Sequence, residues 1–360
     1  MEGMVVSSAF WKGKKVLLTG HTGFKGSWLS LWLQKLHAHV IGFSKDIPTK
    51  PSLFELCNVE DGMTSILGDI RDIEFFKKIM LEHKPEIIIH MAAQSLVHKS
   101  YIDPIETLST NIMGTANVLE AVRGTANACV VINVTSDKCY ETKESVSGYK
   151  ETDPMGGYDP YSSSKGCAEL VTSSFRDSFF NPAYYNKHGV ALASVRAGNI
   201  IGGGDWASNR LIPDIMNGLI ENQIIKIRNP LSVRPWQFVL EPLRGYLMLA
   251  EKLWHEGPQY MSAWNFGPND EDIKPVSWII EKISQKWGKN VNWKLEDSKK
   301  YHEINYLKLD CSKAKMKLGW HPKMNLERSI EWVVHWYKQF EKKQDIRKIT
   351  EEQIDDYSSQ

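Results

Sequence analysis

Short apolar runs alternate with longer amphipathic stretches along the first half of the chain. Runs such as Val16-Leu17-Leu18 and Ile87-Ile88-Ile89 are continuous, which is typical of strands buried on both faces of a parallel sheet. The stretches 25–37 and 110–124 carry apolar residues at helical spacing. Strands that alternate with helices predict an α/β fold, with a Rossmann-type doubly wound parallel sheet that has helices on both faces.

The alternation becomes less regular beyond residue 200, where 228–239 and 289–297 predict short strands and 276–288 and 326–340 predict helices. We therefore expect a smaller C-terminal α/β substrate-binding domain beside the Rossmann domain. The expected bounds are 12–195 for the Rossmann domain with a return segment near 236–265, 196–235 and 266–340 for the second domain, and 341–360 for a charged tail. This tail has few large apolar residues, which predicts a frayed helix or a mobile end.

Composition excludes several classes of protein. The 360 residues include 44 basic and 43 acidic side chains, and this balance argues against a nucleic-acid partner. No segment approaches the ~20 apolar residues that span a bilayer, and the first residues lack the order of a signal peptide. The five cysteines are scattered without a C-x-x-C pair, and the 11 histidines lack an H-x-x-x-H pair. We expect a cytoplasmic protein with reduced thiols, no membrane partner and no metal site.

A glycine-rich turn follows the first predicted strand. Gly20, Gly23 and Gly26 give the spacing G-x-x-G-x-x-G between a strand and a helix. The first glycine permits a sharp turn, the second lets the main chain approach a pyrophosphate, and the third lets the helix pack on the strand. We expect a dinucleotide to contact this whole turn, which comprises Gly20, His21, Thr22, Gly23, Phe24, Lys25 and Gly26. A packing turn without a ligand is the alternative.

The choice of dinucleotide depends on the end of the second strand. An acidic residue there usually binds the adenosine ribose, whereas this chain has Ser44, followed by Lys45 and Asp46. Ser44 can hydrogen-bond a ribose, while Lys45 can attract a 2′-phosphate, and we favour NAD over NADP. Asp69 and Ile70 are candidates for the adenine edge, although Asp69 is equally suited to cap a helix.

Polar residues follow the apolar run Val130-Val131-Ile132, which predicts a buried strand. Ser136, Asp137 and Lys138 lie at its carboxyl end, where open α/β sheets place their chemistry. Asp137 and Lys138 form either a surface ion pair or an acid and a base that face one substrate. Farther along, Tyr161 and Lys165 are four residues apart and share a helix face. A lysine beside a phenol favours the phenolate, so we expect Lys165 to lower the Tyr161 pKa.

Seven segments together resemble the CDP-glucose 4,6-dehydratases, a group of extended short-chain dehydrogenases/reductases that act on nucleotide sugars. The segments span most of the chain and are TGHTGFKGSWLSLWL, HMAAQSLVHKSYIDP, TSDKCY, GYDPYSSSKGCAE, VRAGNIIGGGDWA, RPWQFVLEP and NFGP. The resemblance implies a lyase that uses NAD to oxidise the sugar at C4, loses water across C5 and C6, and returns hydride to C6. The implied pathway makes deoxysugars for the O-antigen of lipopolysaccharide.

The resemblance also implies roles for individual residues. Tyr161 matches the base at the 4-hydroxyl, Lys165 its partner, and Ser136 the residue that hydrogen-bonds the C4 oxygen. Asp137 and Lys138 match the pair that eliminates water. Lysine replaces the glutamate of dTDP-glucose dehydratases, so it acts either as a neutral base at C5 or as a charged stabiliser of the enolate. Further implied cofactor contacts come from a loop and a helix, at Ala92, Ala93, Gln94 and Asn111.

Five residues are candidates for the nucleotide end of the substrate: Ser95, Asn199, Arg210, Arg234 and Trp236. A guanidinium can grip a diphosphate through two bonds. Arg234 could instead form a salt bridge, and Trp236 could stack on the base or fill the core. The cytosine base of CDP-glucose is implied by the resemblance alone.

Two residues of the expected cofactor site, His21 and Ser44, depart from the usual dinucleotide-binding pattern. We expect His21 to crowd the pyrophosphate, and together with Ser44 to make NAD binding loose.

The related dTDP-glucose and GDP-mannose dehydratases and UDP-sugar 4-epimerases are alternative functions, as is an NAD-binding protein without activity. Asp137 and Lys138 argue against the epimerase, while Ser136, Tyr161 and Lys165 argue against an inactive protein. Relatives pair helices like those near 111–123 and 161–180, so we expect a homodimer.

Overall fold

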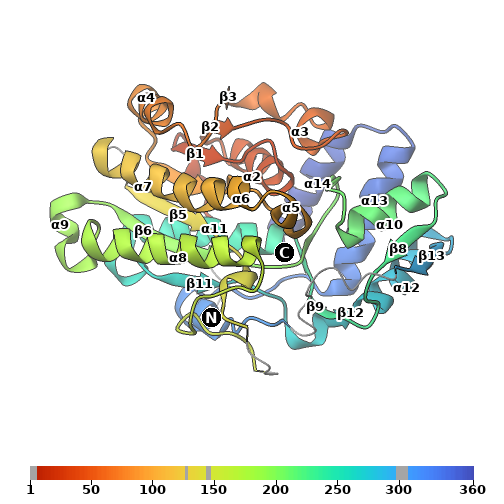
Figure 1. Ribbon diagram of the computed structural model, residues 1–360. Helices are drawn as coiled ribbons and strands as arrows, with labels where there is room; N and C mark the ends of the chain where they lie inside the picture. The colour runs from red at the N-terminus through yellow and green to blue at the C-terminus, as the bar shows by residue number, and fades with distance from the viewer. Residues whose placement is uncertain (1–5, 126–128, 143–146, 297–306) are drawn as a thin grey trace.

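A seven-stranded parallel sheet forms the centre of the molecule. The computed structural model describes residues 6–125, 129–142, 147–296 and 307–360 (Figure 1). The sheet has the order β11-β6-β5-β4-β1-β2-β3 and every neighbouring pair is parallel. The strands are β1 Lys15–Thr19, β2 His39–Ser44, β3 Thr64–Leu67, β4 Ile87–His90, β5 Val130–Val134, β6 Ala191–Arg196 and β11 Ala263–Asn265. The predicted Rossmann-type fold is confirmed.

Helices cover both faces of this sheet (Figure 1). One layer contains α4, α7 and α8 side by side, while α2 and α11 lie on the opposite face. Their bounds are α2 Phe24–Lys35, α4 Ile73–His83, α7 Gly114–Thr125, α8 Pro160–Ser178 and α11 Leu240–Glu256. The shorter helices are α1 Ser8–Trp11, α3 Leu53–Leu56, α5 Val97–Ile102, α6 Pro104–Leu108 and α9 Tyr185–His188, and a π-helical turn spans Ser109–Met113. Because both faces are covered, the central strands are buried, as their continuous apolar runs require.

The order of the strands reverses beside β1. The chain passes from β1 to β2 and β3 on one side, and later to β4, β5, β6 and β11 on the other. Ligands of open α/β sheets bind in the crevice outside the carboxyl ends of the strands at such a reversal. The turn after β1, the loop after β4 and the polar residues after β5 therefore meet at one edge.

The remaining strands form three small two-stranded sheets beyond this edge. β7 Ile200–Ile201 pairs with β10 Gln237–Phe238, β9 Val233–Pro235 with β12 Ile273–Pro275, and β8 Ile225–Ile227 with β13 Trp293–Leu295. The accompanying helices are α10 Leu211–Ile220, α12 Val276–Trp287 and α13 Leu326–Glu341. The strands and helices expected here are present, whereas the proposed domain bounds stay a prediction. No helix in the described ranges is long and apolar enough to cross a lipid bilayer.

The expectation of a frayed or mobile tail was wrong. Residues Ile346–Ser358 form α14, which packs against α13 and α2. Tyr357 is fully buried, and its ring meets Trp32 edge-on at a centroid distance of 5.9 Å. Half of the tail is charged, but Ile346, Ile354 and Tyr357 fall on one helical face and are all buried. The low apolar fraction concealed this stripe.

Candidate active site

The turn after β1 has a conformation and a packing that require glycine. Gly20 has φ +77°, and the N–H of Gly23 donates to its carbonyl oxygen at 3.2 Å. A Cβ on Gly26 would lie only 2.1 Å from the Gly20 oxygen. Helix α2 begins at Phe24, so its free N–H groups face the edge where a pyrophosphate would lie. The turn therefore fits a dinucleotide.

The His21 ring does not lie above this turn, where we expected it to crowd a pyrophosphate. It is fully buried, with Nδ1 2.9 Å from the Ser44 hydroxyl and Nε2 2.8 Å from the Ser65 hydroxyl. Burial lowers the His21 pKa to about 4, so the ring is neutral. The Ser44 hydroxyl also accepts the Thr22 N–H at 3.3 Å. The histidine thus ties the turn to β2 and β3, and Ser44 already has two partners within the protein.

Charged side chains surround the expected adenine end. Asp69 does not cap α4, because Asp72 accepts the Phe75 N–H there at 3.0 Å. Instead, Asp69 binds the Arg71 guanidinium, with its Oδ2 2.6 Å from Nη2. This contact lowers the Asp69 pKa to about 2. Ile70 is buried beside Gly114.

The loop after β4 is fixed by hydrogen bonds to two other segments. The N–H groups of Met91 and Ala92 both donate to the Thr19 hydroxyl at 3.0 Å. Asn111, in the π-helical turn, accepts the Gln94 N–H at 2.8 Å and donates to the Ser164 hydroxyl at 2.8 Å. The loop that contains Ala92, Ala93 and Gln94 is thereby coupled to helix α8. The structure brings these predicted cofactor contacts to the same edge as the glycine turn.

Asp137 lies at the end of β5 in an environment that favours its neutral form. It begins a short 3₁₀ turn, Asp137–Cys139, and its Oδ1 accepts the Ser136 hydroxyl at 3.0 Å. Oδ2 is buried without a hydrogen-bond partner in the described part of the chain. Burial therefore raises the Asp137 pKa. A Cβ on Gly198 would lie 1.7 Å from Oδ2, so Gly198 makes the space for this carboxyl group.

The surface ion pair considered for Asp137 and Lys138 is not formed. Asp137 is only 3 % exposed, whereas Lys138 is half-buried. Both residues belong to the described ranges, and their charged atoms do not come within salt-bridge distance of each other. The Lys138 N–H instead donates to the Ser136 hydroxyl at 3.2 Å. The two residues thus form no ion pair, although the Lys138 charge lowers the Asp137 pKa against burial.

Tyr161 and Lys165 lie on one buried face of α8. Pro160 is the first residue of this helix, and Asp159 caps it by accepting the Ser162 N–H at 2.9 Å. We expected Lys165 to lower the Tyr161 pKa, but burial raises that pKa to about 12. The Lys165 ammonium donates instead to the Val134 carbonyl at 3.3 Å, and burial lowers its pKa to about 8. Ser136 and the Arg210 guanidinium lower the Tyr161 pKa and so partly offset the burial.

Two neighbours of this cluster have positions that the sequence did not indicate. Lys25, expected only as a contact of the cofactor, lies near Lys165 and Arg210, and burial and the charges of these two residues lower its pKa to about 7. Its Nζ lies 6.0 Å from the ring centroid of Tyr246, whose hydroxyl is buried without a partner among the described residues. Tyr246 belongs to the apolar helix α11, and nothing in that stretch of sequence indicates a polar role.

The predicted substrate residues fall into two groups. Arg210 donates to the Asp205 carboxylate and the Ser95 hydroxyl, both at 3.1 Å, so the structure brings Ser95 and Arg210 together. Arg234 lies near Asp137 and helps to hold the pKa of that carboxyl down against burial.

The other two predicted substrate residues, Asn199 and Trp236, lie in a turn and in the core. Asn199 adopts a left-handed conformation with φ +46° in the turn before β7. Trp236 is buried, and its indole N–H donates to the Lys274 carbonyl at 3.0 Å. Trp236 therefore packs in the core, the alternative left open for it, and its assignment as a substrate contact stays a prediction.

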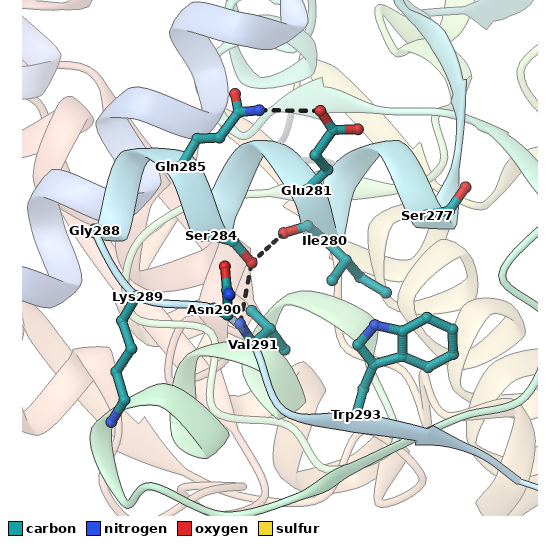
Figure 2. A pocket seen from close by; sticks show the side chains of 10 residues that line it. All are labelled: Ser277, Ile280, Glu281, Ser284, Gln285, Gly288, Lys289, Asn290, Val291 and Trp293. Atoms are coloured by element: carbon teal, nitrogen blue, oxygen red, sulfur yellow. Dashed lines mark hydrogen bonds between the residues drawn. The ribbon is translucent and has the colours of Figure 1, made fainter.

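A separate surface groove lies away from these groups (Figure 2). It runs between α12 and the segment leading to β13, and is lined by residues that include Glu281, Lys289 and Trp293. The Ser284 hydroxyl on its floor donates to the Ile280 carbonyl at 2.9 Å and accepts the Val291 N–H at 3.1 Å. The groove contains none of the predicted site residues.

A glycine turn after the first strand, with a buried tyrosine and lysine facing it from α8, defines a short-chain dehydrogenase/reductase site. The model of the family described as GDP-mannose 4,6 dehydratase matches residues 17–333, and the chain belongs to this family. It is 55 % identical over 355 residues to the CDP-glucose 4,6-dehydratase of Salmonella typhimurium, covering 99 % of each chain. The dTDP-glucose 4,6-dehydratase of Xanthomonas campestris pv. campestris is 25 % identical over 340 residues, covering 89 % of this chain and 92 % of the relative.

Solved structures share the fold. UDP-glucose 4-epimerase from Thermotoga maritima, solved with UDP-glucose, superimposes with a TM-score of 0.78 at 22 % identity, covering 90 % of this chain and 99 % of the other. The dTDP-glucose 4,6-dehydratase of Bacillus anthracis, in complex with NAD, gives 0.76 at 21 % identity, covering 93 % and 100 %. The family expected from the sequence motifs is confirmed.

Proposed function

We propose that this protein is a hydro-lyase that converts CDP-glucose to CDP-4-dehydro-6-deoxyglucose with NAD. The observation that carries the proposal is the buried group of Ser136, Asp137 and Tyr161, in which the Ser136 hydroxyl donates to the Asp137 carboxylate and also lowers the Tyr161 pKa against burial. The 55 % identity to a CDP-glucose 4,6-dehydratase over nearly the whole chain supports the choice of reaction and of nucleotide. The glycine turn would hold the NAD pyrophosphate, and bound NAD supplies the acceptor and donor of hydride.

Oxidation at C4 needs a proton acceptor beside the sugar. The Tyr161 phenolate would take the proton of the 4-hydroxyl, while the Ser136 hydroxyl hydrogen-bonds the same oxygen. Because burial raises the Tyr161 pKa to about 12, the phenolate needs stabilisation by neighbouring charge. The Arg210 guanidinium already lowers this pKa, and Lys165 is the ammonium group that shares the buried face of α8 with Tyr161.

Loss of water needs an acid at the 6-hydroxyl and a group that acts at C5. Asp137 is suited to be the acid, because burial raises its pKa and favours the protonated form. Lys138 is the adjacent group for C5, either as a neutral base or as a cation beside the enolate. Ketone formation at C4 makes the C5 proton acidic, so elimination follows oxidation.

The proton balance explains the position of Ser136. Oxidation leaves the 4-hydroxyl proton on Tyr161, and elimination transfers the Asp137 proton to the departing water, while the C5 proton is later replaced. Each turnover therefore requires one proton to pass from Tyr161 to Asp137. Ser136 hydrogen-bonds Asp137 and lowers the Tyr161 pKa, so we propose that its hydroxyl relays this proton.

The nucleotide would lie toward the smaller sheets. We propose that Arg210 and Arg234 bind the diphosphate; Arg210 donates to the Ser95 hydroxyl at 3.1 Å, and Asn199 lies in the turn before β7. Cytosine is proposed from the relative that is named for CDP-glucose. We also propose that the enzyme works in the cytoplasm and that its product enters deoxysugar synthesis for the O-antigen.

We also propose a homodimer. Met113 before α7 and Leu170 and Phe179 on or beside α8 are 54 %, 58 % and 48 % exposed. Met113 precedes α7, Leu170 belongs to α8 and Phe179 follows it, and α7 and α8 pack against each other on one face of the sheet (Figure 1). Pairing of these helices with a second copy would cover these large apolar side chains. Light scattering should give twice the mass of the chain, and Leu170→Glu should give a monomer.

One assay tests the reaction and the nucleotide together. Purified protein is incubated with NAD and, separately, with CDP-, dTDP-, UDP- and GDP-glucose, and the 4-keto product is followed by its absorbance in alkali. We expect product from CDP-glucose at a rate at least tenfold above the others. A higher rate with another nucleotide would reject the cytosine assignment, and no product from any sugar would reject the dehydratase.

A further inference from the structure

Four charged side chains meet at the carboxyl ends of β2 and β3. We call Lys45, Asp69, Arg71 and Glu106 the adenine-end cluster. Lys45 Nζ lies 3.0 Å from Glu106 Oε1 and 3.7 Å from Asp69 Oδ2. Arg71 binds both carboxylates, with Nη2 2.6 Å from Asp69 Oδ2 and Nη1 against Glu106 Oε2. Glu106 thus contacts both cations, although it comes from α6, in a later part of the chain.

This cluster lies where a dinucleotide site distinguishes its two cofactors. In Rossmann folds the adenosine ribose binds at the end of the second strand, and a basic residue there accommodates the 2′-phosphate of NADP. Ser44 ends β2, and its hydroxyl is engaged by His21 and Thr22. The next residue is Lys45, which by itself would favour NADP. The neighbours of Lys45 therefore decide the preference.

We propose that Glu106 makes the site select NAD, because it occupies both Lys45 and Arg71 and presents a negative charge to a 2′-phosphate. The proposal rests on the proposed use of a nicotinamide dinucleotide at this site. In this arrangement two cations are matched by two carboxylates. A 2′-phosphate would have to displace a carboxylate from each cation and would remain close to two negative charges.

Two observations indicate that Glu106 is held in this position. The Lys45 ammonium and the Arg71 guanidinium lower its pKa, so it is ionised at neutral pH. Its N–H donates to the Asp103 carboxylate at 2.9 Å, and the neighbouring Thr107 hydroxyl accepts from Gln94 Nε2 at 2.8 Å. Helix α6 is thereby anchored to the loop after β4. The side chain of Glu106 is 22 % exposed, so neutralising it should cost little stability.

The test compares cofactor binding without sugar. Calorimetric titration gives the dissociation constants of NAD and NADP for wild type, Glu106→Gln and Glu106→Asp. Glu120→Gln is the matched control, because Glu120 pairs with Arg123 at 2.7 Å on α7 and is similarly exposed, at 33 %. We expect the NADP/NAD ratio of dissociation constants to fall about tenfold in Glu106→Gln, which corresponds to ~1.4 kcal/mol. Glu106→Asp and the control should stay near wild type.

A second variant identifies the cation that is released. Adding Lys45→Met to Glu106→Gln should remove most of the gain in NADP binding. An unchanged ratio in Glu106→Gln would overturn the proposal, as would weaker binding of both cofactors without a change in their ratio. Binding is measured without CDP-glucose, so a wild type that binds NAD but forms no 4-keto sugar would refute only the proposed function.

Discussion

The edge of the sheet carries two charged regions that are built in opposite ways. Around β5 and α8, Asp137, Tyr161 and Lys165 are buried, and burial shifts each pKa toward the neutral form of the group. At β2 and β3, the adenine-end cluster pairs every charge, and its side chains are 22–53 % exposed. There the Arg71 contact lowers the Asp69 pKa to about 2, which favours its charged form.

We attribute acid–base chemistry to the buried region and selection of the cofactor to the adenine-end cluster. A buried group without a full set of partners can change its protonation state at moderate cost, which is what acid–base catalysis requires. A group in an exposed, paired cluster keeps its charge, and its energetic contribution is small. Substitutions in the buried region should therefore change rates by orders of magnitude, and substitutions in the cluster should change affinities by small factors.

The largest effect is expected for Tyr161→Phe. The change removes the proton acceptor at the 4-hydroxyl and leaves the packing of the ring, so folding should persist while turnover falls by at least ~10³-fold. Single-turnover absorbance of the reduced cofactor measures this step. Tyr158→Phe, in an exposed residue just before α8, is the control and should keep wild-type activity. A normal single-turnover rate in Tyr161→Phe would remove Tyr161 from the mechanism.

Asp137→Asn and Lys138→Met should divide the reaction into its halves. Oxidation should survive, because Ser136, Tyr161 and Lys165 remain, so reduced cofactor and the 4-keto-glucose nucleotide should accumulate. General acid–base groups typically contribute 10²–10⁴-fold, and dehydration should fall by about that factor. Exchange of deuterium at C5 should also slow in Lys138→Met. Near wild-type dehydration in both variants would make the pair structural, and a loss of oxidation in both would assign it to binding.

Asp137 should also make stability and activity depend on pH. The pKa of Asp137 in the folded protein is above the usual value of 3.8. As pH rises above 3.8, the unfolded protein therefore loses the Asp137 proton before the folded protein does. The folded state loses stability over this pH range, and the loss is complete once pH exceeds the folded pKa. Asp137→Asn lacks this loss, so it should melt a few degrees above wild type at pH 7 and equally at pH 3. Dehydration by wild type should also slow as pH rises through the folded pKa. A wild type that is more stable than the variant at pH 7 would contradict this account.

The smallest effect is expected for Lys45→Met in the adenine-end cluster. Lys45 is 53 % exposed and already paired, so NAD affinity should change less than about threefold. A related expectation concerns the wild type. The Ser44 hydroxyl already hydrogen-bonds His21 and Thr22, so it offers the ribose a weak contact, and the purified protein should release less than one equivalent of NAD on denaturation. A change in NAD affinity of tenfold or more in Lys45→Met would show that the two regions differ less than proposed.

The sequence determined the features that depend on neighbouring residues. The alternation of strands and helices, the glycine turn at 20–26, and the four-residue spacing of Tyr161 and Lys165 are local patterns, and each is present as expected. The position of Ser136 and Asp137 at a strand end follows from the same local reasoning. The resemblance to known dehydratases then indicated the family correctly.

Only the tertiary structure decided contacts between distant segments, because their distances depend on how all the layers pack. Glu106 reaches Lys45 across 61 positions, and Arg210 reaches Ser95 across 115. Burial is likewise a property of the whole fold, so spacing predicted a lowered Tyr161 pKa where burial raises it. Composition made 341–360 look like a mobile tail, whereas packing buries Tyr357 beside Trp32. The local pattern placed the reactive groups on their elements, and the packed protein set their charge states.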